Sequence, residues 1–127
     1  MYRKVKLMFL VLLLASGPVF AHQWTPTYVQ FRPSYVKGIS VVKMELFNSR
    51  MDIDYYSIGA FDVNWNPVKF VSSEEILNVK YRQRRSVDIY VNTFDIPRVV
   101  YICSKSKILN NEKDRALVSS RICSKVK

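Results

Sequence analysis

The chain is poor in the residues from which most enzyme active sites are built. It has one histidine, His22, and two cysteines among 127 residues. It has no HExxH metal motif, glycine-rich phosphate loop or dinucleotide fingerprint. A Ser-His-Asp or Cys-His arrangement would have to use His22 at the start of the mature chain. We therefore predict that the protein is not an enzyme and holds no cofactor.

Long helical periodicity is also missing, and short alternating segments rich in β-branched and aromatic residues take its place. In residues 39–47, for example, Val42, Met44 and Leu46 share one face of an extended strand, and charged residues share the other. Further strands are expected at residues 28–31, 53–61, 68–71, 76–81, 86–92, 99–103 and 116–126. This pattern predicts an all-β, immunoglobulin-like Greek-key β-sandwich of about seven strands.

The connections between these strands are rich in turn formers and charged residues. Residues 62–67 should close a hairpin into the strand at 68–71, and residues 93–98 should cross over to the next strand. Residues 105–115 are polar and charged, which is typical of a mobile surface loop. Gly59, inside a strand, indicates a bulge or a close neighbour.

The one long apolar run lies at the N-terminus. Three basic residues in the first six precede apolar residues 7–15, and Val19-Phe20-Ala21 has the form of a signal-peptidase site. The run is shorter than the roughly 20 apolar residues of a membrane-spanning helix. We predict a signal peptide over residues 1–21, a single domain over residues 22–127, no transmembrane segment, and export to the periplasm or the outside.

Acidic residues are half as numerous as basic ones. The predicted mature chain keeps 17 basic and 10 acidic residues, a balance of +7. This balance favours anionic partners such as membrane surfaces, envelope polysaccharide or an acidic protein face, or else serves solubility alone. No specific recognition of nucleic acid is expected.

One local cluster of basic residues is a candidate anion-binding site. It consists of Lys80, Arg82, Arg84 and Arg85. In an anion-binding role these side chains would contact phosphate or carboxylate groups. The alternative is a solvated, charged turn that discourages edge-to-edge aggregation.

The only cysteines, Cys103 and Cys123, are predicted to form one disulfide in an exported chain. The bond would close a loop of about 20 residues and contribute roughly 3 kcal/mol in the chain-entropy model. The alternative is two free thiols in a product that never meets an oxidase. The spacing is too long for a CxxC redox site, and two cysteines are too few for structural zinc.

His22 carries a further hypothesis. If cleavage follows Ala21, His22 becomes the first residue, and its amine and imidazole could chelate copper. The alternative is that His22 is merely the residue that follows the cut.

Aromatic residues near basic ones form another candidate surface. A reader of carbohydrate or single-stranded nucleic acid needs stacking faces, and the alternative is that the rings cap the ends of the core. The residues concerned are Trp24, Trp65, Tyr28 and Tyr35, with Arg32 and Lys37.

Residues 40–92 contain a series of segments whose order resembles a known family. A strand ends in Leu46-Phe47-Asn48-Ser49 and is followed by YYSIGAF at residues 55–61. A polar hairpin with Asn66-Pro67, a hydrophobic strand, a basic turn and SVDIYV at residues 86–91 complete the series. This order resembles the N-terminal immunoglobulin-like domain of periplasmic pilus-assembly chaperones, over about half the mature chain.

The resemblance implies a fold and a way of binding. In that family an exposed sheet edge holds an extended segment of a protein partner by strand addition, and alternate apolar side chains fill a groove. Two basic residues of the family grip the partner's terminal carboxylate. Arg32 and Lys125 lie in roughly comparable places on the first and last strands and are the partner-binding candidates.

Together these observations predict an exported protein-binding module, chaperone-like or an envelope adaptor, that binds by strand addition or through loops. The alternative is a basic envelope protein that binds anionic surfaces or glycans through the basic cluster around Arg82. The minor alternative is copper binding at His22.

Overall fold

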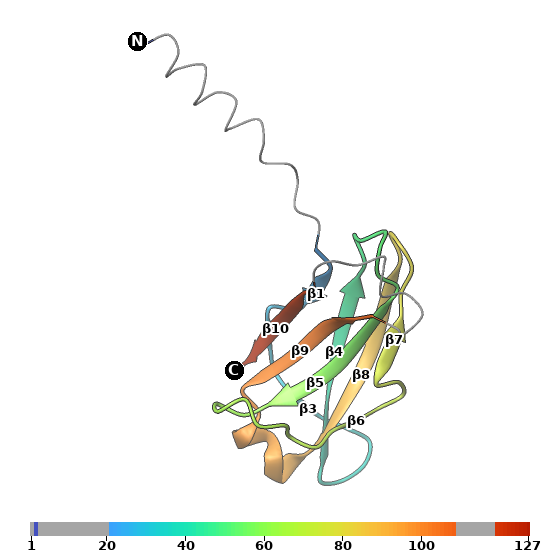
Figure 1. The fold of residues 1–127 in the computed structure, drawn as a ribbon. Coiled ribbons are helices and arrows are strands. Elements are labelled where there is room, and N and C mark those ends of the chain that lie inside the picture. Colours follow the sequence, from blue (N-terminus) through green and yellow to red (C-terminus); the bar gives the residue numbers. More distant parts are fainter. Residues whose placement is uncertain (1, 3–20, 109–118) are drawn as a thin grey trace.

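The computed structural model describes residues 2, 21–108 and 119–127 (Figure 1). The predicted signal peptide, residues 1–21, lies outside the described residues apart from Tyr2 and Ala21. No helix in the described part of the chain has the length and apolar character needed to span a membrane.

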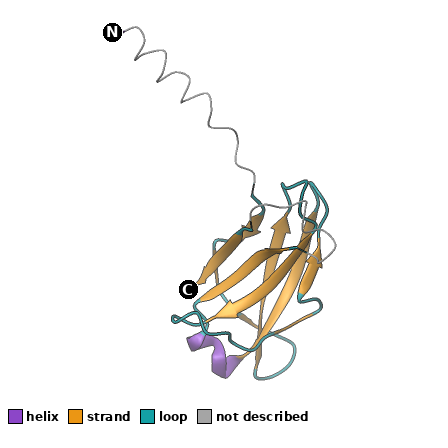
Figure 2. Cartoon of the chain, viewed as in Figure 1, coloured by secondary structure: helices purple, strands orange, loops and turns teal. Residues whose placement is uncertain are grey.

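Two β-sheets packed face to face make up the described domain (Figures 1 and 2). One sheet has the order β1-β4-β8-β6, with β3 also paired to β4, and the other has the order β2-β10-β9-β5-β7. The predicted all-β, immunoglobulin-like sandwich is confirmed. The strands are β1 (Gln23–Thr25), β2 (Tyr28–Val29), β3 (Arg32–Pro33), β4 (Ile39–Phe47), β5 (Tyr55–Phe61), β6 (Val71–Ser72), β7 (Ile76–Asn78), β8 (Arg84–Asn92), β9 (Tyr101–Lys107) and β10 (Arg121–Val126).

The core lies between the sheets and follows the predicted alternation. β4 and β8 pair in antiparallel register from Ile39 opposite Asn92 to Phe47 opposite Arg84. The inward side chains of β4, β5 and β8 are buried, and Met44, Leu46 and Tyr56 among them are fully inaccessible. Each large apolar side chain buried in this way stabilises the fold by about 1.5–3 kcal/mol.

The strand predicted at residues 28–31 is wrong in its bounds. The N-terminal chain instead forms three short strands that change sheets: β1 and β3 pair with β4, and β2 pairs in parallel with β10. Pro26 and Pro33 have no backbone N–H for a ladder, which keeps these strands short and at sheet edges.

The predicted hairpin at residues 62–67 forms, but the strand after it is displaced. Phe61 bridges Pro67, and the Val68 N–H donates to the Ala60 carbonyl over 2.8 Å. The chain then leaves this sheet, and β6 pairs with β8 in the other one. The next strand, predicted at residues 76–81, ends at Asn78 in a turn where Arg82 has a φ of 63°.

The crossover near the C-terminus has the predicted bounds, and the two strands that follow it do not. The crossover at residues 93–98 is a 3₁₀ helix, η1 (Thr93–Arg98), whose N-cap Asn92 accepts a hydrogen bond from the Phe94 N–H. β9 runs on to Lys107, so residues 105–107 are strand and not loop. The rest of the predicted loop falls mostly on residues 109–118, outside the described residues, and β10 begins at Arg121.

Candidate functional site

The last strand, β10, has an edge that is only partly covered (Figure 1). β9 pairs with it along one side, from Arg121 to Lys125. On the other side β2 pairs only with Lys125 and Val126. Within the described residues, no strand pairs with residues 121–124 on that side, a length of about 13 Å at 3.3 Å per residue, although β1 packs close to β10.

The hydrogen bonds of β10 show which backbone groups point to this open edge. Val126 donates to Val100, next to β9, so the even-numbered residues of β10 face β9. Lys125 donates in the opposite direction, to Thr27 beside β2. The backbone N–H and C=O groups of successive strand residues point to opposite edges. Those of Arg121 and Cys123 therefore face the open edge.

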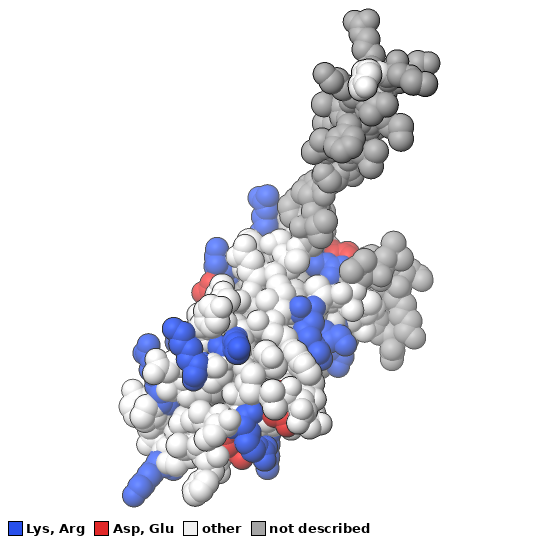
Figure 3. Space-filling view, turned by 90° about the vertical axis from the view of Figure 1, so that its left-hand side faces the viewer, with Lys and Arg blue, Asp and Glu red and all other residues white. Residues whose placement is uncertain are grey.

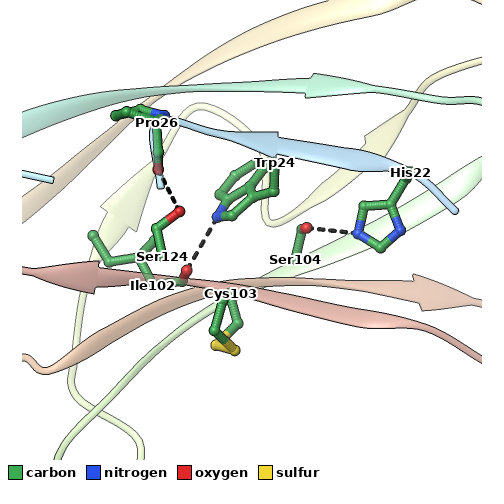
Figure 4. The surroundings of a disulfide bond; sticks show 8 residues. His22, Trp24, Pro26, Ile102, Cys103, Ser104 and Ser124 are labelled. Carbon is green, nitrogen blue, oxygen red and sulfur yellow. Dashed lines mark hydrogen bonds between the residues drawn. A yellow bond between two sulfur atoms is a disulfide. The ribbon is translucent and has the colours of Figure 1, made fainter. Parts of the chain in front are cut away.

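The predicted disulfide joins β10 to β9 beside this edge (Figure 4). Cys103 and Cys123 are directly opposite each other, with Cα atoms 4.0 Å apart. Their sulfurs project from the outer face of the sheet, away from β1. The bond therefore links β10 covalently to β9, which pairs with β5 in the middle of the sheet.

On the inner side, β1 is attached to β9 and β10 by side-chain hydrogen bonds (Figure 4). The buried Trp24 donates its Nε1–H to the Ile102 carbonyl over 3.0 Å, and the Ser124 hydroxyl donates to the Pro26 carbonyl. His22 Nε2 lies 2.8 Å from the Ser104 hydroxyl. These bonds connect the first strand of one sheet to the last strands of the other.

His22 is buried, and both ring nitrogens have partners. Nδ1 lies 3.1 Å from the Ser120 hydroxyl, and the ring packs against Tyr56 with centroids 4.6 Å apart. Burial lowers the pKa of His22 to about 4. Copper binding at His22 stays a prediction and would require the contact between a serine and the ligating ring nitrogen to break. No cluster of three or more potential metal-ligating side chains occurs in residues 21–108 and 119–127.

A buried polar network closes the same end of the sandwich. The Asn48 amide donates to the carbonyls of Ile53 and Val79, and its oxygen accepts from the Tyr56 hydroxyl. Arg50 is also buried, and its hydrogen bonds to Asp52 hold the pKa of that carboxyl below its usual range. Each of these polar groups is satisfied, so the network fixes this end of the domain.

The outer faces of β9 and β10 are basic. Lys105 and Lys107 on β9, with Arg121 and Lys125 on β10, form what we call the cationic face. Neither strand carries an acidic residue, and no ion pair within the described part of the chain involves these four side chains. Figure 3, which looks onto the side of the molecule where β10 lies, shows more Lys and Arg than Asp and Glu.

Two of these cations are directly opposite each other. Lys105 pairs with Arg121 in the antiparallel register. It is a non-hydrogen-bonded pair, the kind that brings side chains closest, and like charges directly opposite destabilise a sheet. The intramolecular arrangement therefore leaves a repulsion on this face.

Aromatic rings surround the Arg121 side chain. Its guanidinium carbon lies 5.1 Å from the ring centre of Phe61 and 5.6 Å from that of Trp65, which in turn stacks on Tyr101. The close neighbour predicted at Gly59 is the Phe61 ring, which would lie 2.7 Å from a Cβ at that position. Aromatic contacts of this kind favour a fixed position for the Arg121 cation.

The predicted aromatic surface is divided between several places. Trp24 belongs to the core, so its proposed part in a surface is wrong, and Trp65 lies on the outer face of the β9 sheet. Tyr28, Tyr35 and Arg32 line one groove of about 1030 Å³ beside β3 and β4. Lys37 does not line it.

The two partner-binding candidates lie on different sheets. Arg32 is on β3, beside β4, and lines the groove. Lys125 is on β10, between Tyr28 and Tyr101, and does not line it.

Half of the basic cluster predicted as an anion site is already paired within the protein. Arg84 forms an ion pair with Glu45 at 2.9 Å, and Arg85 forms one with Glu74. Arg82 lies over the Tyr81 ring at 5.4 Å, and Lys80 has no ion pair among the described residues.

Three residues of the cationic face, Lys105, Lys107 and Arg121, were not singled out from the sequence. The signal that could have found them is the spacing of Lys105 and Lys107, two positions apart with a serine between. That spacing puts both on one face of a strand. The prediction of a loop at residues 105–115 left this strand spacing out of account.

No protein-family model matches the chain, and no curated protein matches it in sequence. The E. coli chaperone DraB matches it in structure with a TM-score of 0.62 and 18% identity, over 86% of this chain and 54% of DraB. PapD-like domain 7 of human CEP192 gives a TM-score of 0.48 at 10% identity, over 87% of this chain and 92% of that domain. The match thus spans about half the length of DraB, and at the level of the fold it confirms the resemblance to the immunoglobulin-like domain of the pilus-assembly chaperones.

Proposed function

We propose that the protein is an exported, non-enzymatic protein-binding module, chaperone-like or an envelope adaptor. It holds an extended segment of its partner as an added strand on the open edge of β10. The observation that carries this proposal is the edge at residues 121–124, which no described residue pairs with, beside a disulfide that ties β10 to its sheet. The shared fold with the chaperone DraB supports it.

The open edge offers main-chain hydrogen bonds to an extended segment. The outward N–H and C=O groups of Arg121 and Cys123 provide two donors and two acceptors. Each such bond contributes about 0.5–1.5 kcal/mol net. The disulfide fixes these groups before binding, which reduces the ordering that an added strand has to impose.

Other edges of the sandwich are less suited to strand addition. Arg85 spans from β8 to the Asn78 carbonyl and to Glu74, across part of the edge of β8 that β6 leaves free. β6 and β7 are edge strands of two and three residues, and short edge strands offer little to pair with. β4 has a gap at residues 42–44 between β1 and β3, one residue shorter than the open part of β10.

Electrostatic binding to an anionic surface or glycan through the basic cluster at residues 80–85 is the alternative function. Arg84 and Arg85 already have carboxylate partners, which leaves less free charge there than the sequence suggests. Such binding would weaken steeply as salt screens the charges.

The test is a pull-down of the tagged mature protein from its own envelope fraction, at low and high salt, with bound proteins identified by mass spectrometry. Arg121→Pro removes one outward N–H at the first residue of a strand, where proline is tolerated. Arg121→Ala is the matched control, because it removes the charge and keeps the N–H. We expect a stoichiometric partner that survives high salt with the wild type and is lost with the proline variant. Capture of only lipid or glycan, lost at high salt, would contradict the proposal.

A further inference from the structure

The side chains beside the open edge of β10 indicate what kind of segment fits there. This inference rests on the proposed function, because it concerns the same edge. At the open end the outer face carries Lys105, Lys107 and Arg121. The connecting residues 109–118 contain two acidic and two basic residues, so their sequence adds no net charge.

Strand geometry determines where the partner's side chains would lie. A strand added to β10 places every second side chain on the outer face of the sheet, next to Arg121 and Cys123. Residues directly opposite each other have Cβ atoms about 4.5–5.5 Å apart. A side chain of the added strand would therefore lie next to the Cβ of Arg121, whose guanidinium lies on the other side of β10, over Phe61 of β5.

The existing repulsion between Lys105 and Arg121 favours a negative charge at that position. Arg121 has a like charge opposite it on β9, and no carboxylate contacts it within the described residues. Its guanidinium is held over the Phe61 and Trp65 rings, on the outer face of the sheet. A carboxylate of the added strand would offset the repulsion, and it would form a favourable cross-strand pair with Arg121 once that side chain turns from the rings towards the open edge.

The pair of strands β4 and β8 shows how the protein neutralises a basic side chain with one of its own carboxylates. Arg84 of β8 lies directly opposite Phe47 of β4. It forms an ion pair with Glu45, which precedes Phe47 by two residues on β4. No corresponding carboxylate is present on β9 or β10. The missing charge would come from the added strand.

We propose that the segment held at the β10 edge is acidic, with carboxylate side chains at alternate positions on the same face as Arg121 and Lys105. The segment is extended, and its other side chains face the sandwich interior, where the partly buried Ile122 lies.

The test uses three synthetic peptides that alternate valine with glutamate, with glutamine or with lysine. Binding is measured by calorimetry or fluorescence at low and high salt. We expect the glutamate peptide to bind about fivefold more tightly than the glutamine peptide at low salt, because one opposite-charge pair forms with Arg121, the cation of β10 at the open edge. At about 1 M salt the preference should shrink to about twofold, and the lysine peptide should bind most weakly.

A double variant tests whether the preference for glutamate comes from the cationic face or from the net charge of the protein. Lys105→Gln with Arg121→Gln should abolish the preference for glutamate over glutamine. Lys80→Gln with Arg82→Gln removes the same charge elsewhere and should keep the preference.

Three results would contradict these proposals, each at a different point. Equal binding of the glutamate and glutamine peptides would contradict the acidic segment and leave strand addition standing. Failure of all three peptides to bind would contradict strand addition itself. Glutamate binding that heparin displaces and that is unchanged in Arg121→Pro would contradict both, and would point to a polyanion held without the edge.

Discussion

The two basic surfaces of this domain differ in how their charges are balanced. On the β4–β8 sheet, Arg84 and Arg85 form ion pairs with Glu45 and Glu74. On the β9–β10 sheet, Lys105 is opposite Arg121 with no acidic residue on either strand. The ion pairs stabilise the fold, whereas the like-charge pair destabilises it. A like-charge pair is the arrangement expected where the proposed partner supplies the negative charge.

The two strand pairs also differ in how they are held together. β4 and β8 pair over nine residues without a covalent link, whereas five register pairs and a disulfide join β9 to β10. The basic strand pair that we propose for binding is therefore the one with the covalent link.

The largest expected effect comes from breaking that link. Replacing both cysteines by alanine, or reducing the bond, should lower the free energy of unfolding by about 3 kcal/mol. Thermal unfolding with and without reductant measures the loss. Hydrogen exchange should show β9 and β10 loosening before β4 and β8. An unchanged unfolding midpoint would contradict the structural role of the bond.

Acid should weaken the connection between β1 and the β9–β10 sheet through His22. The pKa of His22 in the folded chain is about 4, below its ordinary value of 6.5, so the unfolded chain takes up the proton first as pH falls. The contribution of His22 to the free energy of unfolding should therefore be fully present above about pH 6.5. It should decrease between pH 6.5 and about 4, with a slope of at most 1.4 kcal/mol per pH unit.

Denaturant titrations across this pH range test the expectation. His22→Gln removes the titrating group and should reduce the slope between pH 6.5 and 4. An equal slope in the variant would assign the acid sensitivity to other groups.

One charge reversal on each surface tests the contrast between them, because the two reversals should change the stability of the fold in opposite directions. Lys105→Glu turns a like-charge pair with Arg121 into an opposite-charge pair and should stabilise the fold by about 0.5 kcal/mol. Glu45→Lys breaks an exposed ion pair with Arg84 and should destabilise it by a similar amount. Both effects should fade at high salt, and equal signs in denaturant titrations would contradict the comparison.

The sequence was sufficient to predict the centre of the fold and less so its edges. β4, β5 and β8 have several apolar residues at alternate positions, so all three were predicted as strands, and the buried face of β4 was predicted correctly. β1 was missed because Trp24 is its only buried side chain, and one apolar residue makes no pattern. The end of β9 was missed because Ser104 and Ser106 face inward between charged residues.

The candidate site was predictable only in part. The disulfide followed from having two cysteines in a chain with a predicted export signal, and it is present. The cationic face depends on the register that brings Lys105 opposite Arg121 across residues 109–118. No local pattern in the sequence specifies that register. The open edge likewise depends on where β2 begins and ends beside β10.

Backbone amide exchange of β10, measured residue by residue by NMR with and without the partner, tests the central claim most directly. In the free domain we expect fast exchange at Arg121 and Cys123, whose N–H groups face the open edge, and slow exchange at Ile122 and Ser124, which face β9. Binding should slow exchange at Arg121 and Cys123 alone within this strand. A bound complex in which these two amides still exchange fast, with protection at β6 or β7 instead, would contradict strand addition at β10.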